Sequence, residues 1–176
     1  MKNSISLFVL VLVMALVSCN CPVGKKAVSA PETEIAVAFA DYGPQPFVFD
    51  IEAYTLENGL FRQALWTGTY MQMTLMSIEP GGEIGLERHD DIDQFIRVEA
   101  GKGLILMGDS EDNLDFQEAL EDDFAAFIPA GKWHNVINTG DEPLKLYSIY
   151  APAEHPFGTI HNTYEEAMEA EHDHHH

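Results

Sequence analysis

The chain has 176 residues, of which 46% are hydrophobic, and it carries a formal net charge of −20. After removal of a leader, this length is enough for one domain with an adequate core and too short for two. Nine residues are Lys or Arg, against 29 Asp and Glu, so the clustered cations that neutralise phosphates are absent. We therefore expect no nucleic-acid partner and no attraction to anionic lipids.

The first residues are typical of an export signal. Lys2 precedes an apolar run over residues 5–17, which is too short for a usual transmembrane helix, and Leu16-Val17-Ser18-Cys19 resembles the lipobox of bacterial lipoproteins. We expect a signal peptide over residues 1–18 and lipidation of Cys19. The protein would then be exported and held at a membrane of the cell envelope by this anchor alone. An ordinary secretory signal is the alternative.

The middle of the chain predicts a tether followed by a β-domain. Residues 19–45 contain several Pro and Gly with little periodicity, which is typical of a linker. Residues 46–152 contain short apolar runs of strand length, separated by Gly, Pro, Asn and Asp clusters. The runs are residues 47–51, 72–78, 94–99, 103–107, 124–128 and 144–150. They predict an all-β sandwich or jelly roll, with the acidic residues 111–123 in a loop or an edge strand.

Polar residues at the first of two segments could form a site. Glu87 and His89 lie two residues apart, so on a strand both side chains leave the same face. Gln94 begins an alternating run and shares its face with Ile96 and Val98. The residues between His89 and Gln94 are mostly polar and turn-like, which predicts a hairpin that returns Gln94 toward His89.

The second segment supplies a fourth candidate ligand. Pro129 and Gly131 break the preceding strand, and after them His134 faces the same way as Val136 and Asn138. On neighbouring strands, His134 and the first segment could hold one ion.

These two segments resemble the two motifs of the cupin family. Residues 81–101 are similar to the first motif, which is a glycine, five residues, His-x-His, three or four residues, Glu, six residues and Gly. Pro129, Gly131, His134 and Asn138 match the second motif. The resemblance implies a double-stranded β-helix, that is a jelly-roll barrel, with a divalent metal. Since cupins commonly form dimers, it also makes a homodimer possible.

The chain departs from the family pattern at three positions. Glu87 stands where the first histidine would be, Gln94 where the glutamate would be, and Asp123 where the second motif would open with glycine. Asp93 could take the acidic position through the shorter family spacing. Gln94 is favoured because it lies at the family's distance before Gly101 and on the apolar face. The one carboxylate of the implied ligand set is therefore at Glu87 and not at the family's glutamate position. A divalent ion bound by this set has the same formal charge as one bound by the family's usual set.

The implied metal ligands are Glu87, His89, Gln94 and His134, and the implied ion is Mn, Fe, Ni or Zn. Four protein ligands leave two open positions on a six-coordinate ion. This predicts Lewis-acid isomerase or lyase chemistry, or dioxygenase chemistry, on an oxygen-rich small molecule such as a sugar, a dicarbonyl compound or a hydroxy acid. Both histidines must be neutral to bind, so we expect occupancy to fall below about pH 6.

Two alternatives compete with an enzyme. The first is a non-catalytic surface lipoprotein that binds a metal or a sugar, and the second is a hydrogen-bonded polar cluster without metal. A purely structural barrel is disfavoured because buried polar residues are costly without a role. A titratable group in the pocket besides the ligands would favour an enzyme. Tyr147, His155 and His161 are candidates with ordinary packing or loop roles, and Arg62 or Arg88 could attract an anionic substrate.

Residues 153–176 are expected to form a C-terminal extension. Thr163-Tyr164-Glu165-Glu166 has the capping-box pattern, which predicts a short helix. The chain ends in His172-Asp173-His174-His175-His176. A histidine run binds metal ions without any fold, and we assign it no role in catalysis.

Overall fold

The computed structural model describes residues 40–174, with side chains as far as residue 170. Cys19, the predicted signal peptide and most of the predicted tether lie outside the described residues. Within residues 40–174, no helix is long and apolar enough to cross a membrane.

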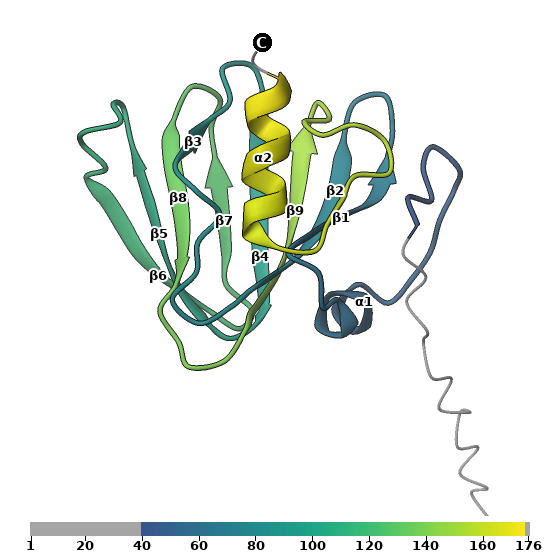
Figure 1. Cartoon of the computed structure of the whole chain (residues 1–176), viewed down its shortest axis with the longest axis horizontal. Helices are drawn as coiled ribbons and strands as arrows, with labels where there is room; N and C mark the ends of the chain where they lie inside the picture. The colour runs from purple at the N-terminus through teal and green to yellow at the C-terminus, as the bar shows by residue number, and fades with distance from the viewer. Residues whose placement is uncertain (1–39, 175–176) are drawn as a thin grey trace, which may run out of the picture. The chain divides into compact units, whose positions relative to one another are not determined.

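The described residues form two antiparallel sheets (Figure 1). The larger sheet has six strands in the order β10-β1-β2-β9-β4-β7, and the smaller has four in the order β3-β8-β5-β6. The strands are β1 (Arg62–Thr67), β2 (Gln72–Ile78), β3 (Glu87–Arg88), β4 (Asp93–Ala100), β5 (Lys102–Gly108), β6 (Phe116–Glu121), β7 (Ala125–Ile128), β8 (Trp133–Asn138), β9 (Leu144–Ala151) and β10 (Ile160–His161). The predicted all-β jelly roll is confirmed, and its core lies between the sheets.

Alternation along the central strands explains which side chains fill this core. In β4, Gln94, Ile96 and Val98 are buried, as their shared face predicted. In β9, Leu146 and Tyr150 are buried on the same side, because Leu146 pairs with Val98 and Tyr150 with Gln94. Apolar residues of the smaller sheet meet this face and complete the core. The inward face of these two strands is thus apolar except at Gln94, Ser148 and Tyr150.

The strand expected over residues 47–51 is wrong. The chain forms helix α1 (Ile51–Glu57), which begins after Asp50, whose carboxylate accepts a hydrogen bond from the backbone N–H of Ala53. The apolar residues before it, Phe47 and Phe49, stack on one another and pack against the outer face of the larger sheet. The alternating apolar residues before Asp50 therefore pack on the outer face of the sheet and do not form a strand. Asp50, as the N-cap residue, determines that a helix begins here.

The end of the predicted tether is bound to the barrel. The backbone N–H of Tyr42 donates to the carbonyl of Leu65, and Asp41 accepts hydrogen bonds from the backbone and the hydroxyl of Thr67. The packed part of the chain therefore begins before residue 46.

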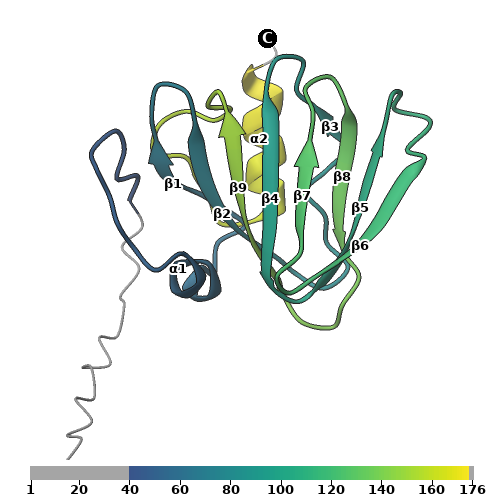
Figure 2. The ribbon, with the colours of Figure 1, turned by 180° about the vertical axis from the view of Figure 1, so that it is seen from behind.

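The predicted C-terminal helix is present as α2 (Tyr164–His174). Its first turn is capped as expected, because Thr163 Oγ1 accepts from the backbone N–H of Glu166 at 3.3 Å. Ala167 is buried in the core, and Tyr164 and Met168 pack against it. In Figure 1 α2 lies in front of the strands, and in Figure 2, from behind, it lies beyond β4 and β9. The helix thus covers the core at the side where β3 and β10 are edge strands.

Candidate metal centre

Pairing of β3 with β8 brings three of the four predicted ligands together. Glu87 lies opposite His134 in the ladder, and His89 follows β3 directly. Glu87 Oε1 lies 3.2 Å from His134 Nε2 and 3.4 Å from His89 Nε2. The three ligand atoms all lie within 4.8 Å of one another. This is a geometry that one ion could satisfy.

The hairpin expected between His89 and Gln94 is wrong. β3 belongs to the smaller sheet and β4 to the larger one, so the polar residues between them cross from sheet to sheet. A two-residue strand cannot direct a hairpin, and its pairing with β8 sets its position instead.

Hydrogen bonds at the outer ring nitrogens orient both histidines. His134 Nδ1 lies 3.0 Å from the carbonyl of Lys132, and His89 Nδ1 lies 3.4 Å from a carboxylate oxygen of Glu154. Because a carbonyl only accepts, His134 Nδ1 carries a proton, and a neutral ring would present its Nε2 lone pair to Glu87. Two acceptors at 3.2 Å repel one another unless a proton or a metal ion lies between them. The arrangement therefore fits a cation, held by ligands with the outer hydrogen bonds typical of metal-bound histidine.

Gln94 offers an oxygen to the same interior. Its side chain is 3% exposed, and its Nε2 donates to Ser148 Oγ at 3.3 Å. Its Oε1 is buried and makes no hydrogen bond within the described part of the chain. Tyr150, beside Gln94 in the ladder, packs edge-on against His89 with ring centroids 5.8 Å apart. Asp93 is exposed and accepts a hydrogen bond from the backbone of Ala130, so its carboxylate faces away.

Charge pairing holds this cluster together without a metal. Burial alone would raise the pKa of Glu87, but the contacts with His134 and His89 and the charge of Arg62 outweigh it, so the pKa is lowered. Burial would lower the pKa of His89, but its contacts with Glu154 and Glu87 raise it to about 10. In the metal-free protein, a proton on His89 thus balances the Glu87 carboxylate.

The chain is similar to a known protein family and to individual proteins. Residues 74–150 match the family model described as a cupin domain. The chain is 58% identical over 131 residues to protein YrkC of Bacillus subtilis, covering 74% of this chain and 70% of that protein. It is 40% identical over 117 residues to protein L612 of Acanthamoeba polyphaga mimivirus, covering 66% of this chain and 71% of that protein.

A solved structure agrees with the sequence relatives. The crystal structure of BH2720 from Bacillus halodurans is 60% identical, with a TM-score of 0.73, and the match covers 74% of this chain and 98% of that one. The chain belongs to the cupin superfamily. None of these three names states an activity, so the family model gives the family of this cupin and the solved structure its fold, but neither gives its reaction.

The cupin interior holds further titratable groups beside the ligands. Of the three that sequence nominated, Tyr147 packs on the outer face of the larger sheet, whereas His155 packs edge-on against Tyr150 with centroids 5.1 Å apart. His161 lies opposite Arg62 in the ladder between β10 and β1. Arg62 is fully buried, while Arg88 is exposed and pairs with Asp90.

Sequence reasoning missed two members of this group. Tyr150 could have been found, because alternation along the strand over residues 144–150 places it on the face of Leu146 and Ser148. Glu154 gave no signal, since it lies in a loop whose position depends on tertiary contacts. Gln72 fixes that loop: its Oε1 accepts from the backbone N–H of His155 and its Nε2 donates to the carbonyl of His155, each at 2.9 Å.

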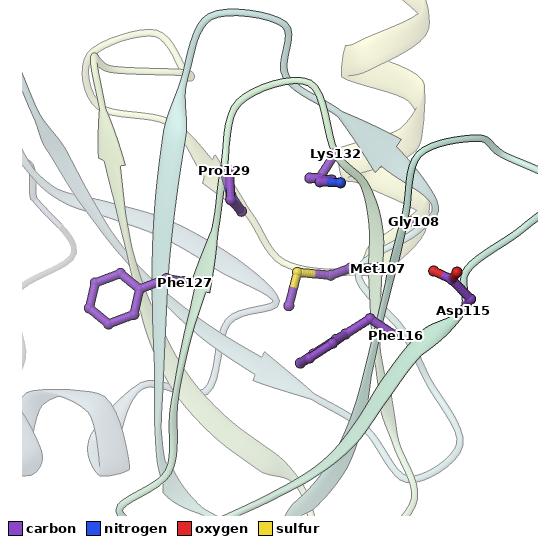
Figure 3. A pocket seen from close by; sticks show the side chains of 7 residues that line it. All are labelled: Met107, Gly108, Asp115, Phe116, Phe127, Pro129 and Lys132. Atoms are coloured by element: carbon purple, nitrogen blue, oxygen red, sulfur yellow. The ribbon is translucent and has the colours of Figure 1, made fainter.

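A hollow elsewhere on this cupin has a different character. It lies between β7 and the strands β5 and β6 and has a volume of about 260 Å³ (Figure 3). Met107 and Phe116, which are partners in the ladder, form part of its wall, and Lys132 and Asp115 are its charged members. It contains none of the four predicted ligands. Its mainly apolar wall does not match metal chemistry, so the candidate centre remains the cluster around Glu87.

Proposed function

We propose that this cupin binds a divalent transition metal through Glu87, His89, Gln94 and His134, and that it uses the metal to transform an oxygen-rich small molecule. The observation that carries the proposal is the convergence of Glu87 Oε1 with two histidine Nε2 atoms, at 3.2 and 3.4 Å, with all three ligand atoms within 4.8 Å of one another. The unpartnered Gln94 Oε1 supports it.

A bound ion would act as a Lewis acid toward substrate oxygens, and Mn, Fe, Ni and Zn all suit nitrogen and oxygen ligands. The surrounding residues have separate roles. Glu154 and the carbonyl of Lys132 hold the two imidazoles in the orientation for binding. Ser148 accepts from the amide nitrogen of Gln94, which turns the amide oxygen away from it.

An enzyme is favoured over a non-catalytic binding protein by the groups beside the ligands. His155 keeps a buried Nε2 without a hydrogen bond in the described residues. Burial, and next the charge of Arg62, lower the pKa of His155 to about 3, so this imidazole is neutral at physiological pH. A neutral imidazole can accept or donate a proton beside a metal-bound substrate, and simple capture of an ion does not need one.

The test is conversion that depends on the metal. Metal-free protein and protein loaded in turn with Mn, Fe, Ni or Zn would be incubated with sugars, dicarbonyl compounds and hydroxy acids, with products followed by proton NMR. We expect conversion with one or more metals, its loss in His134→Ala, and its retention in Asp90→Asn, which changes an exposed neighbour of His89. Saturable binding of ligands without conversion by any loaded form would favour the binding protein.

We also propose that the protein is a lipoprotein of the cell envelope, anchored through Cys19. The support is the lipobox-like sequence before this residue. Incorporation of labelled palmitate in a bacterial host tests it: wild type should be labelled and Cys19→Ala should not. Labelling of neither would contradict the anchor.

A further inference from the structure

A buried arginine lies inside the barrel of this acidic protein. Arg62 begins β1 and lies opposite Met76 of β2, which belongs to the core between the sheets. Cross-strand partners share a face, so the Arg62 side chain enters the interior, where it is 0% exposed. Burial of an ion costs several kcal/mol after relaxation, and Arg62 makes contacts within the protein that offset this cost.

The charge of Arg62 acts on the residues around the candidate metal. Burial of Glu87, Tyr150 and His155 has the largest influence on their pKa values, but the positive charge of Arg62 lowers all three. The groups also connect by contact, because the Tyr150 ring packs edge-on with both His155 and the ligand His89. The metal ligands and the arginine therefore face one common interior.

The other two groups are held in place and can donate or accept. Tyr150 is 1% exposed, and burial, and next the charge of Glu87, raise the pKa of its phenol, so it keeps its proton. His155 is fixed through its backbone by Gln72, which is itself fully buried. The buried His155 Nε2 has no hydrogen-bond partner in the described residues. A buried polar atom of this kind requires a partner from a ligand or from water.

We propose, on the basis of the function proposed above, that Arg62, Tyr150 and His155 form an anion subsite beside the metal ligands. The substrate is then a small carboxylate with a second oxygen that reaches the metal, such as a hydroxy acid. A guanidinium has five N–H donors, so Arg62 can contact protein groups and still donate to a carboxylate. A neutral sugar would gain only hydrogen bonds from a buried guanidinium, whereas an anion also gains a charge attraction that offsets repulsion by a protein of net charge −20.

The test compares two probes that differ in charge and not in size. Glycolate and glycolamide would be titrated calorimetrically into the manganese-loaded full chain, after its metal content has been measured. A metal alone favours the carboxylate to some extent, so the decisive quantity is the ratio of the two dissociation constants in variants. Arg62→Met removes the buried charge, Arg62→Lys keeps it, and Arg88→Met removes an exposed charge on β3.

We expect Arg62→Met to reduce the preference for glycolate at least about tenfold, the size of a lost charge-assisted hydrogen bond. Arg62→Lys should keep most of the preference and Arg88→Met all of it. An unchanged ratio in a folded, metal-loaded Arg62→Met protein would overturn the subsite and leave the metal centre standing. Absence of metal from wild type would overturn both. If Arg62→Met does not fold, a wild type that binds both probes equally, or an Arg62→Lys protein that loses the preference, overturns the subsite.

Discussion

Proton competition at His89 should control metal binding across neutral pH. The contacts with Glu154 and Glu87 raise the pKa of His89 in the metal-free protein from 6.5 to about 10, against the effect of burial. At pH 7 the incoming ion must displace this proton, so apparent affinity should rise about tenfold per pH unit through the neutral range. For an ordinary histidine we expected metal occupancy to fall only below about pH 6. With the raised pKa of His89, the apparent metal affinity should already fall as pH decreases below that pKa.

The sign of the linked stability follows from the same shift. The pKa of His89 is higher in the folded than in the unfolded metal-free protein, so its ion pairs stabilise the fold fully below about pH 6.5. This contribution is lost as pH rises through about 10. The shift corresponds to about 4 to 5 kcal/mol as an upper bound for a mostly buried group.

Two measurements check this prediction. Nitrogen-15 NMR of the imidazole rings in metal-free protein should show His89 titrating near pH 10. Calorimetry in buffers of different ionisation enthalpy should show proton release on metal binding at pH 7.5. Glu154→Gln is the matched variant: it removes the charge of one carboxylate partner, so the pKa of His89 should fall. A His89 that titrates near 6.5, with no proton released, would contradict proton competition at this residue.

Three further substitutions test the site and the fold. Gln94→Leu should lower metal affinity by about tenfold or more, since loss of even an outer-sphere partner has this effect, while Asp93→Asn should leave it unchanged in a competition titration. Asn138→Ala removes three hydrogen bonds of a buried side chain and should destabilise the protein by about 2 to 4 kcal/mol in urea unfolding. Gly101→Ala should destabilise by about 2 kcal/mol or more, because its φ is +91° and the added Cβ would lie 2.8 Å from the carbonyl of Pro143. Equal metal affinity in Gln94→Leu and wild type would show that Gln94 is not a ligand. A free energy of unfolding equal to that of wild type in Asn138→Ala or Gly101→Ala would contradict the contacts described for that residue.

Local patterns predicted much of the fold because they report directly on burial. The runs at residues 72–78, 103–107 and 144–150 became β2, β5 and β9, with ends shifted by at most one residue. The exposed strand β6 was expected only as a loop or an edge, since its mostly polar residues carry little alternation. The sequence did not predict helix α1, because the aromatic residues beside Asp50 indicated a strand more strongly than Asp50 indicated an N-cap.

The candidate site shows where such patterns end. Glu87, His89 and His134 lie close to motif glycines and prolines, so the spacing of the motifs was enough to predict that these three residues meet. Arg62 could not be located, because its burial depends on pairing of β1 not only with the next strand, β2, but also with β10, which is distant in sequence. The position of Glu154 depends likewise on the hydrogen bonds between Gln72 and His155. The positions of Arg62 and Glu154 are thus determined by tertiary contacts and not by local sequence.

Elemental analysis would show whether this cupin holds a metal at Glu87, His89, Gln94 and His134. The full chain and the double variant His89→Ala/His134→Ala would be compared after identical reconstitution. Both keep the C-terminal histidines, so the contribution of the tail cancels. We predict close to stoichiometric metal at this site in wild type and its loss in the variant, with the identity of the ion read from the same measurement. Equal metal content in the two proteins would contradict the account and reduce the four residues to a hydrogen-bonded cluster.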